Sequence, residues 1–255
     1  MTSNLTKSGG FSMDLFETMI HHSSVRSFTQ QELSAELKER LILAAQSASS
    51  SNFLQAFSLI EITDQKKRKA IEKIANFPVD NGNNGQFYIF VADLNKHANV
   101  LTLKEDSMEY LRTMESLVVA IVDATLAAQS MAVYAESVDL GICYVGGIRN
   151  DLFQMKEILD LPELTYPVFG MFIGYPAVKN EVKPRMPVNA VLGTNTYRSL
   201  TPELINSYDE ETTAYYQGRR SNVQETNWSE KVHQHFEFPR RQNTSEFLKK
   251  QGFVF

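Results

Sequence analysis

Four short polar segments could hold an anion and a flat polar ring. They supply cations, hydroxyl groups and backbone N–H groups that glycine leaves accessible, which together suit a phosphate joined to an aromatic ring. No GxxxxGK[ST] loop is present and no GxGxxG follows a strand, so a nucleotide-like ligand would not be held by a P-loop or in the Rossmann manner. The segments are His22–Phe28 (HSSVRSF), Ser49–Asn52 (SSSN), Tyr144–Gly147 (YVGG) and Val182–Arg185 (VKPR).

Two of these segments carry cations at alternating positions. His22, Ser24 and Arg26 would share one side of an extended segment and could bind an anion; the alternative is a solvated loop between two helices. Lys183 and Arg185 flank a proline that restricts the backbone, so both could reach one phosphate. The alternative for this pair is an ordinary basic surface.

The other two segments offer hydroxyls and glycines. Gly146 and Gly147 would let the backbone come close to a flat ligand, and an N–H group there could donate to a ring nitrogen that changes its protonation during reaction. An ordinary turn after a strand is an equally good interpretation. The run Ser49–Ser51 could place a hydroxyl on a ligand, but serines at the end of a helix usually act as a stop signal.

The composition excludes several other classes of site. The chain has 255 residues, 25 basic against 30 acidic ones, and a net charge of −5, which argues against a general nucleic-acid surface. The single cysteine, Cys143, rules out an internal disulfide and reads as an inert core thiol. His233 and His235 lack a supporting third ligand, so we expect no metal site. The sequence contains no GxSxG motif that would point to covalent catalysis.

Neither a signal peptide nor a membrane span is expected. Residues 1–12 are polar and have no apolar core, so we interpret them as a flexible leader. The long apolar stretch Leu117–Val138 is interrupted by Asp123, Gln129 and Glu136, which favours a buried helix. A cytoplasmic location fits these features and the cysteine content.

The periodicity of the chain predicts an α+β domain that positions these segments. The core spans residues 13–177, and 178–255 form an extension of the same domain that has too few apolar residues to fold alone. Ser34, Asp64 and Thr201 are expected helix caps, the last with Pro202 at the first helical position. Strands are expected at 56–63, 86–92, 141–145 and 168–173; helices at 13–21, 34–47, 64–75, 105–139, 149–159, 201–216, 228–236 and 246–251, with Gly141 ending the long helix 105–139.

The order and separation of several motifs resemble the oxygen-insensitive nitroreductase and NADPH-flavin oxidoreductase family, in its flavin reductase branch. The resemblance runs from about Met13 to Phe255. Its motifs are SSSNFLQ (49–55), EITD (61–64), ESVDLGICYVGGIRND (136–151), VFGMFIGYPA (168–177), VKPRMP (182–187), YDEE…YY (208–216) and LKKQGF (248–253).

This resemblance implies a homodimeric flavoprotein with a nitroreductase-like fold. The fold would have a mixed, mostly antiparallel sheet flanked by helices, one FMN at each of two interface sites, and a C-terminal extension that wraps the partner subunit. The implied phosphate ligands are His22, Ser24, Lys183 and Arg185; Arg26 would lie near N1 and O2 of the ring; Ser50 and Asn52 would contact the ribityl chain or ring; Tyr144, Gly146 and Gly147 would line the ring, with an N–H near N5.

The chain departs from the family pattern at three places. Ser23, counted among the cofactor-binding positions, replaces the usual arginine. Pro78 stands where a ring-contacting glutamine is expected, and Asn81, Asn83, Asn84 or Gln86 are the possible substitutes. Arg219, with Arg220 beside it, matches one arginine of the pyridine-nucleotide loop, but a second basic position appears as Gln224 or Glu225. The loss of that charge would weaken a preference for NADPH and make use of NADH plausible.

The implied activity is FMN-dependent NAD(P)H oxidoreduction. Hydride, which carries two electrons, would pass through flavin N5 to nitroaromatics, quinones or free flavin, with ping-pong kinetics. Arg26, Gly146 and Gly147 would be the catalytic positions. Two alternatives remain open: a non-catalytic protein that stores or senses flavin, and an interaction module whose basic stretch 219–241 binds an anionic partner.

Overall fold

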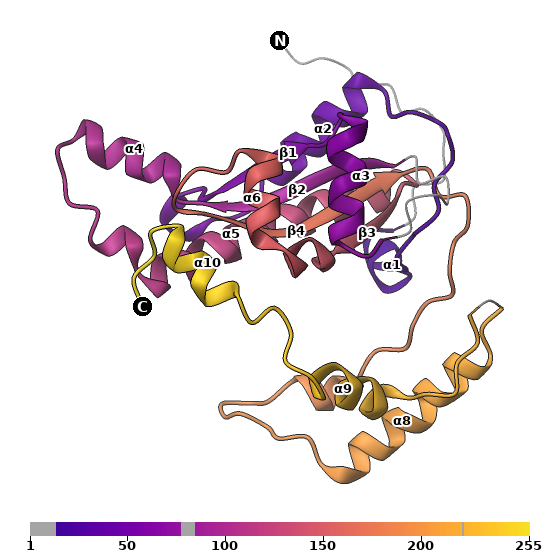
Figure 1. Cartoon of the computed structure of the whole chain (residues 1–255). Helices are drawn as coiled ribbons and strands as arrows, with labels where there is room; N and C mark the ends of the chain where they lie inside the picture. The colour runs from indigo at the N-terminus through magenta and orange to yellow at the C-terminus, as the bar shows by residue number, and fades with distance from the viewer. Residues whose placement is uncertain (1–13, 78–84, 221) are drawn as a thin grey trace. The chain divides into compact units, whose positions relative to one another are not determined.

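A four-stranded antiparallel sheet forms the centre of the larger part of the chain, which carries the N-terminal residues (Figure 1). The computed structural model describes residues 14–77, 85–220 and 222–255. The strands are β1 (Phe57–Glu61), β2 (Gln86–Asp93), β3 (Gly141–Val145) and β4 (Thr165–Gly174), in the order β1-β2-β4-β3. The helices are α1 (Leu15–Ile20), α2 (Ala35–Gln46), α3 (Gln65–Ile74), α4 (Asn95–Leu103), α5 (Met114–Ser137), α6 (Leu152–Leu159), α7 (Val188–Val191), α8 (Pro202–Gln217), α9 (Trp228–Phe236) and α10 (Thr244–Lys250).

Both faces of the sheet are buried. Along β2, Tyr88 and Phe90 belong to one apolar cluster, whereas Phe87 and Ile89 belong to another, because successive side chains of a strand point to opposite faces. The first cluster includes residues of α2 and α5, and the second includes residues of α3 and α6. Figure 1 shows these two pairs of helices on opposite sides of the sheet, so the α+β layer arrangement expected from the sequence is confirmed.

The helix caps expected from the sequence are also confirmed. The Ser34 hydroxyl accepts the N–H of Leu37 at the start of α2, and the Asp64 carboxylate accepts two N–H groups at the start of α3. Thr201 caps α8, whose first residue is Pro202. Each cap satisfies an N–H group that a helix cannot satisfy internally, which explains why these positions are readable from sequence.

The expected helix over 105–139 is wrong at its beginning. Residues 105–113 are not part of an α-helix: Glu105 takes a left-handed conformation with φ of 56°, and Tyr110–Arg112 form a short 3₁₀ helix. The helix α4, which the sequence did not predict, ends before this stretch, at Leu103. The long helix α5 starts only after Thr113, whose hydroxyl accepts the N–H of Ser116. The left-handed residue and the cap at Thr113 therefore exclude 105–113 from the long helix, although the composition of this stretch favours a helix.

The role predicted for Gly141 as a left-handed cap is also wrong. Asp139 takes the left-handed conformation after α5, with φ of 63°. A side chain at Gly141 would instead collide with Val25, because an added Cβ would lie 2.5 Å from its Cγ2 atom. The glycine is thus required by close packing of a neighbouring segment on β3.

α5 is the helix on which the site is built. Among the described residues, α5 is the one helix that is long and apolar enough to cross a membrane, judged by length and composition alone. In this structure its alanine-rich face, including Ala120, Ala124 and Ala128, is fully buried in the core. Small side chains let the helix lie close to the sheet.

The chain forms two compact units, Met1–Lys179 with Asn243–Phe255, and Asn180–Gln242. The C-terminal tail belongs to the first unit: Phe247 and Phe253 lie in its core, and the fully buried Gln251 donates from Nε2 to the carbonyls of Pro162 (2.8 Å) and Thr165 (2.9 Å). The end of the expected 178–255 extension is therefore anchored on the core of its own chain.

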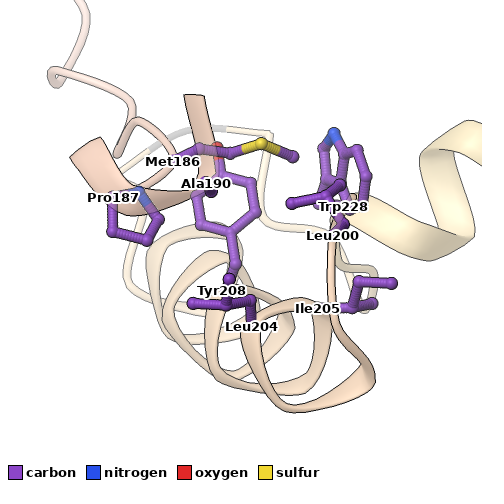
Figure 2. A pocket seen from close by; sticks show the side chains of 8 residues that line it. All are labelled: Met186, Pro187, Ala190, Leu200, Leu204, Ile205, Tyr208 and Trp228. Atoms are coloured by element: carbon purple, nitrogen blue, oxygen red, sulfur yellow. The ribbon is translucent and has the colours of Figure 1, made fainter. Parts of the chain in front are cut away.

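The second unit has a small apolar core of its own, shown in Figure 2. Met186, Tyr208 and Trp228 meet there, and the eight side chains leave no space for a water molecule. The Tyr208 hydroxyl donates to the Pro184 carbonyl at 3.0 Å. This bond ties the segment that carries Lys183 and Arg185 to α8.

Candidate functional site

The segment His22–Phe28 runs along the edge strand β3. The N–H of Val25 donates to the carbonyl of Ile142 at 2.8 Å, and the buried side chains of Val25 and Phe28 hold the segment against the sheet. Arg26, between them, is exposed. The packing of apolar residues thus leaves a cation available at a fixed place on the surface, as the sequence predicts.

His22 is oriented by a carboxylate. Its Nδ1 atom lies 2.6 Å from Oε1 of Glu136, near the C-terminal end of α5, and both side chains are largely buried. A carboxylate bonded to one ring nitrogen fixes the orientation of the imidazole and leaves Nε2 for another partner.

The segment Ser50–Gln55 follows α2 as a tight loop. Asn52, Phe53 and Gln55 all have positive φ, at 46°, 60° and 52°. For residues other than glycine, this conformation costs about 1–2 kcal/mol each. The hydroxyl oxygen of Ser50 is buried and has no hydrogen-bond partner among the described residues. A buried hydroxyl without a partner is unfavourable in the free protein, so this atom fits a position that meets a ligand.

The segment Tyr144–Gly147 leaves β3 and enters a short 3₁₀ helix, Gly146–Asn150, rather than a simple turn. The two glycines differ in their surroundings. A Cβ at Gly147 would lie 2.3 Å from the carbonyl oxygen of Ala75, so this residue must be glycine for packing alone. A Cβ at Gly146 would meet only Arg149, at 3.5 Å. Of the two, Gly146 is the one that packing leaves open to a ligand.

Tyr144 contacts α5 and keeps its proton at physiological pH. Its hydroxyl donates to Oε1 of Gln129 at 3.4 Å, and its ring meets Phe169 edge to face. Burial raises the pKa of the phenol, and the charge of Glu136 raises it further. The side chain is therefore a neutral hydrogen-bonding group beside the glycines.

Three polar residues of α5 connect these segments. Asp123 accepts N–H groups of the Ser50–Gln55 loop and of Ala56, Gln129 contacts Tyr144, and Glu136 holds His22. They are spread over about 20 Å of helix. Sequence reasoning used all three to reject a membrane span and quoted Glu136 within the family motif 136–151, but it did not assign them to the site. The signal that could have identified them is that they are polar residues within an otherwise apolar helix.

Cys143 is the buried thiol expected from the sequence. Burial raises its pKa, although the charge of Arg26 acts in the opposite direction. The thiol is therefore a poor nucleophile and part of the core. No group of three or more His, Cys, Asp or Glu side chains that could hold a metal ion occurs in the described part of the chain.

The remaining basic site residues lie in the second unit. Lys183 and Arg185 are exposed, as is Arg220, whose N–H donates to Glu181 at 3.2 Å. The guanidinium of Arg219 lies 5.9 Å from the ring centre of Tyr215, and its Nε atom is buried without a partner among the described residues. Whether these cations converge with His22 and Ser24 stays a prediction, because the two groups belong to different units.

Lys231 lies beside Gln224, one of the two positions at which the sequence lacks the second basic residue of the family's pyridine-nucleotide loop. Lys231, on α9, donates from Nζ to Oε1 of Gln224 at 2.7 Å, and the same Nζ lies 5.4 Å from the ring centre of Tyr216. Lys183 approaches that ring at 5.4 Å as well. The tertiary structure thus places a positive charge beside Gln224 that sequence alignment alone could not supply.

Some expectations fall outside the described residues. Pro78 and its possible substitutes Asn81, Asn83 and Asn84 are among them, as are the leader 1–12 and Met13. Gln86, the remaining candidate substitute, begins β2 and is half-buried.

The chain resembles known proteins over most of its length. The nitroreductase family matches residues 20–175, and the C-terminal domain of the same family matches residues 183–255. An FMN reductase (NADPH) of Bacillus subtilis is 38% identical over 93% of this chain and 97% of that protein; an oxygen-insensitive NADPH nitroreductase of Salmonella typhimurium is 35% identical, over 93% and 97%. The solved NfrA1 nitroreductase of B. subtilis superposes with a TM-score of 0.88 at 38% identity, covering 94% and 99% of the two chains.

Fold and sequence therefore define an oxidoreductase with the nitroreductase-like fold, which confirms the expected fold class and resemblance. The chain belongs to the nitroreductase family.

Proposed function

We propose that this protein is an NAD(P)H-dependent FMN enzyme that reduces nitroaromatics, quinones or free flavin. One observation of the structure supports it most: three segments with the polar groups expected around FMN are all bonded to α5. One of them carries the buried Ser50 hydroxyl, which has no partner in the part of the chain that the structure describes. The relatives named FMN reductase and NADPH nitroreductase support the same activity.

The residues present fit FMN. The phosphate would be held by His22, Ser24, Lys183 and Arg185, with Ser23 in place of an additional arginine. Ser50 and Asn52 would contact the ribityl chain or the ring, and Tyr144, Gly146 and Gly147 would line it.

When bound, FMN supplies the ability to accept hydride from NAD(P)H at N5 and to deliver it to a second molecule. Arg26 would lie near N1 and O2, where its fixed positive charge stabilises the negative charge that develops on reduction. A backbone N–H of the Gly146–Gly147 segment would donate to N5, and the neutral Tyr144 would cover the ring edge. Donor and acceptor would use one open site in turn, which gives ping-pong kinetics.

A homodimer is part of this proposal. Met114, Val118, Val122 and Leu126, here called the α5 stripe, recur every four residues along the solvent side of the helix and are each 42–47% exposed. Further along the same helix, Leu15 of α1 and Val133 line an open groove of about 430 Å³. A contiguous apolar surface of this kind is typical of a protein interface, and a second copy of this chain would cover it.

NADPH use is supported by the charges of the second unit. Arg219 would bind the 2′-phosphate of NADPH, and Lys231, held beside Gln224, would supply the second cation. Arg220 follows Arg219 in the chain and would add to the positive charge.

The proposed activity can be tested on the purified protein. Its absorbance spectrum should show bound flavin, and anaerobic titration with NADPH or NADH should bleach it, with reoxidation by an added quinone. A protein that stays colourless and inactive after FMN is added would contradict the proposal. Bound flavin that neither nucleotide bleaches would favour a storage or sensor protein.

Arg185→Ala should weaken FMN retention. Removal of a charged hydrogen bond to phosphate should cost about 1.5–3 kcal/mol, or roughly 10- to 100-fold in the dissociation constant. The dissociation constant can be measured by quenching of flavin fluorescence. Arg240→Ala, at another exposed arginine of the second unit, is the control and should bind FMN like the wild type.

Arg219→Ala and Lys231→Ala should each raise KM for NADPH more than KM for NADH. Each removes a cation that would pair with the 2′-phosphate, so an increase of about tenfold for NADPH is expected. Initial rates with the two nucleotides measure this, and FMN content should stay unchanged. If both nucleotides are affected equally, the 2′-phosphate assignment is wrong.

A further inference from the structure

Asp123 is a buried carboxylate in the middle of α5. It is 1% exposed. Its Oδ1 atom accepts the N–H of Ser51 at 3.0 Å and its Oδ2 atom accepts the N–H of Ala56 at 2.9 Å. One side chain therefore bonds to both ends of the Ser50–Gln55 loop.

The loop needs such an anchor because its own conformation is strained and its side chains are exposed. Three of its residues have positive φ, and Phe53 is 81% exposed, so burial in the core does not hold the loop in place. Its other described attachments come from α4: the His97 ring contacts the carbonyl of Leu54 at 2.9 Å, and Lys96 donates to that of Gln55 at 3.3 Å.

The anchored end of the loop is also where the unpartnered hydroxyl lies. Ser50 precedes Ser51, whose N–H is bound by Asp123, and Asn52 follows it. Strained backbone that is held by a buried charge and presents an unsatisfied polar atom is typical of a preformed ligand site.

We propose that Asp123 is a positioning residue for the cofactor: its carboxylate holds the Ser50–Gln55 loop so that Ser50 and Asn52 meet bound FMN. This inference rests on the proposed function, since it requires FMN at that loop. Asp123 acts through backbone N–H groups and does not itself touch the ligand.

Asp93 provides a matched comparison within the same chain. It is also a buried aspartate, and it accepts the N–H of Asn95 at 3.0 Å and the hydroxyl of Ser58 at 2.6 Å. It lies at the end of β2, where it supports the regular helix α4. Among the described residues, the Asp93 carboxylate does not bond to the Ser50–Gln55 loop itself and is linked to it only through Lys96 and His97 of α4. Asp93→Asn therefore reports the effect of weakening a buried carboxylate that does not anchor the loop directly.

The test substitution is Asp123→Asn, measured on the holoprotein. The amide keeps the volume but presents NH₂ to one of the two N–H groups, so the loop loses one attachment. We expect the FMN dissociation constant to rise about tenfold and the visible flavin spectrum to shift, because a hydrogen bond to a charged group is lost. Asp93→Asn should lower the melting temperature similarly and leave FMN affinity within twofold of the wild type.

A double-mutant cycle with Ser50→Ala separates positioning from general destabilisation. If Asp123 acts through the loop, Ser50→Ala should weaken FMN binding clearly in the wild type and little in the Asp123→Asn background. Chymotrypsin cleavage at the exposed Phe53 gives a second readout, and it should be faster in Asp123→Asn than in Asp93→Asn. If Asp123→Asn does not fold, Asp123→Glu, which keeps both acceptors but shifts them, takes its place in the same measurements.

Several results would overturn the inference. Additive effects in the cycle, or unchanged FMN affinity and spectrum in the Asp123 variant, would exclude a positioning role while leaving the proposed function intact. A wild-type protein that binds no FMN would instead contradict the proposed function, and with it this inference.

Discussion

Gly147→Ala is expected to destabilise the protein by about 3 kcal/mol, the upper end of what overpacking usually costs, because the new methyl group meets backbone and not a movable side chain. The added Cβ would lie 2.3 Å from the carbonyl oxygen of Ala75 and 2.9 Å from its Cα. Either the end of α3 or the 3₁₀ helix Gly146–Asn150 must move. The melting temperature, followed by circular dichroism, should fall by about 10 °C.

Gly146→Ala is the matched control for this prediction. The same methyl group one residue earlier meets only Arg149, at an ordinary contact distance of 3.5 Å, so the fold should be retained. If Gly146 faces the flavin as proposed, this variant should fold normally and yet bind FMN more weakly. A Gly147→Ala protein as stable as the wild type would show that α3 yields easily and that packing does not require this glycine.

Val122→Glu should convert the proposed dimer to monomers. The substitution lies in the α5 stripe, and a two-fold interface contains each residue twice, so two carboxylates would be buried without partners. Each unpaired buried charge costs about 3–5 kcal/mol, which raises the dimer dissociation constant about 1,000-fold or more. Analytical ultracentrifugation over a range of concentrations measures the change.

The control for this prediction is Val100→Glu. Val100 is an exposed valine of α4, at 55%, outside the α5 stripe, so the same chemical change there should leave the dimer intact. A Val122→Glu protein that remains dimeric would place the interface elsewhere. Monomers that still retain FMN at wild-type affinity would contradict the location of FMN at the subunit interface.

The elements of the fold were predictable wherever a local rule decides them. Ser34, Asp64 and Thr201 start helices because their side chains satisfy N–H groups a few residues away, and the alternation in β2 follows from the geometry of any strand. The start of α5 was missed because composition over 105–113 favours a helix, whereas the left-handed Glu105 and the cap at Thr113 interrupt it.

The sequence by itself determined the family, the α+β class and the polar segments around which a site could form, since these depend on residue types and order. Only the tertiary structure decided what connects the segments. Asp123, Gln129 and Glu136 are far from them along the chain, and folding brings each to its partner through contacts that no local pattern encodes.

The same distinction holds for the glycines and the missing cation. Gly147 looks like a ligand-facing residue in the sequence, and the fold places Ala75 against it. Gln224 looks like a lost positive charge, and the fold places Lys231 beside it. Residue types state what chemistry is possible, but long-range packing decides which atoms are close enough to perform it.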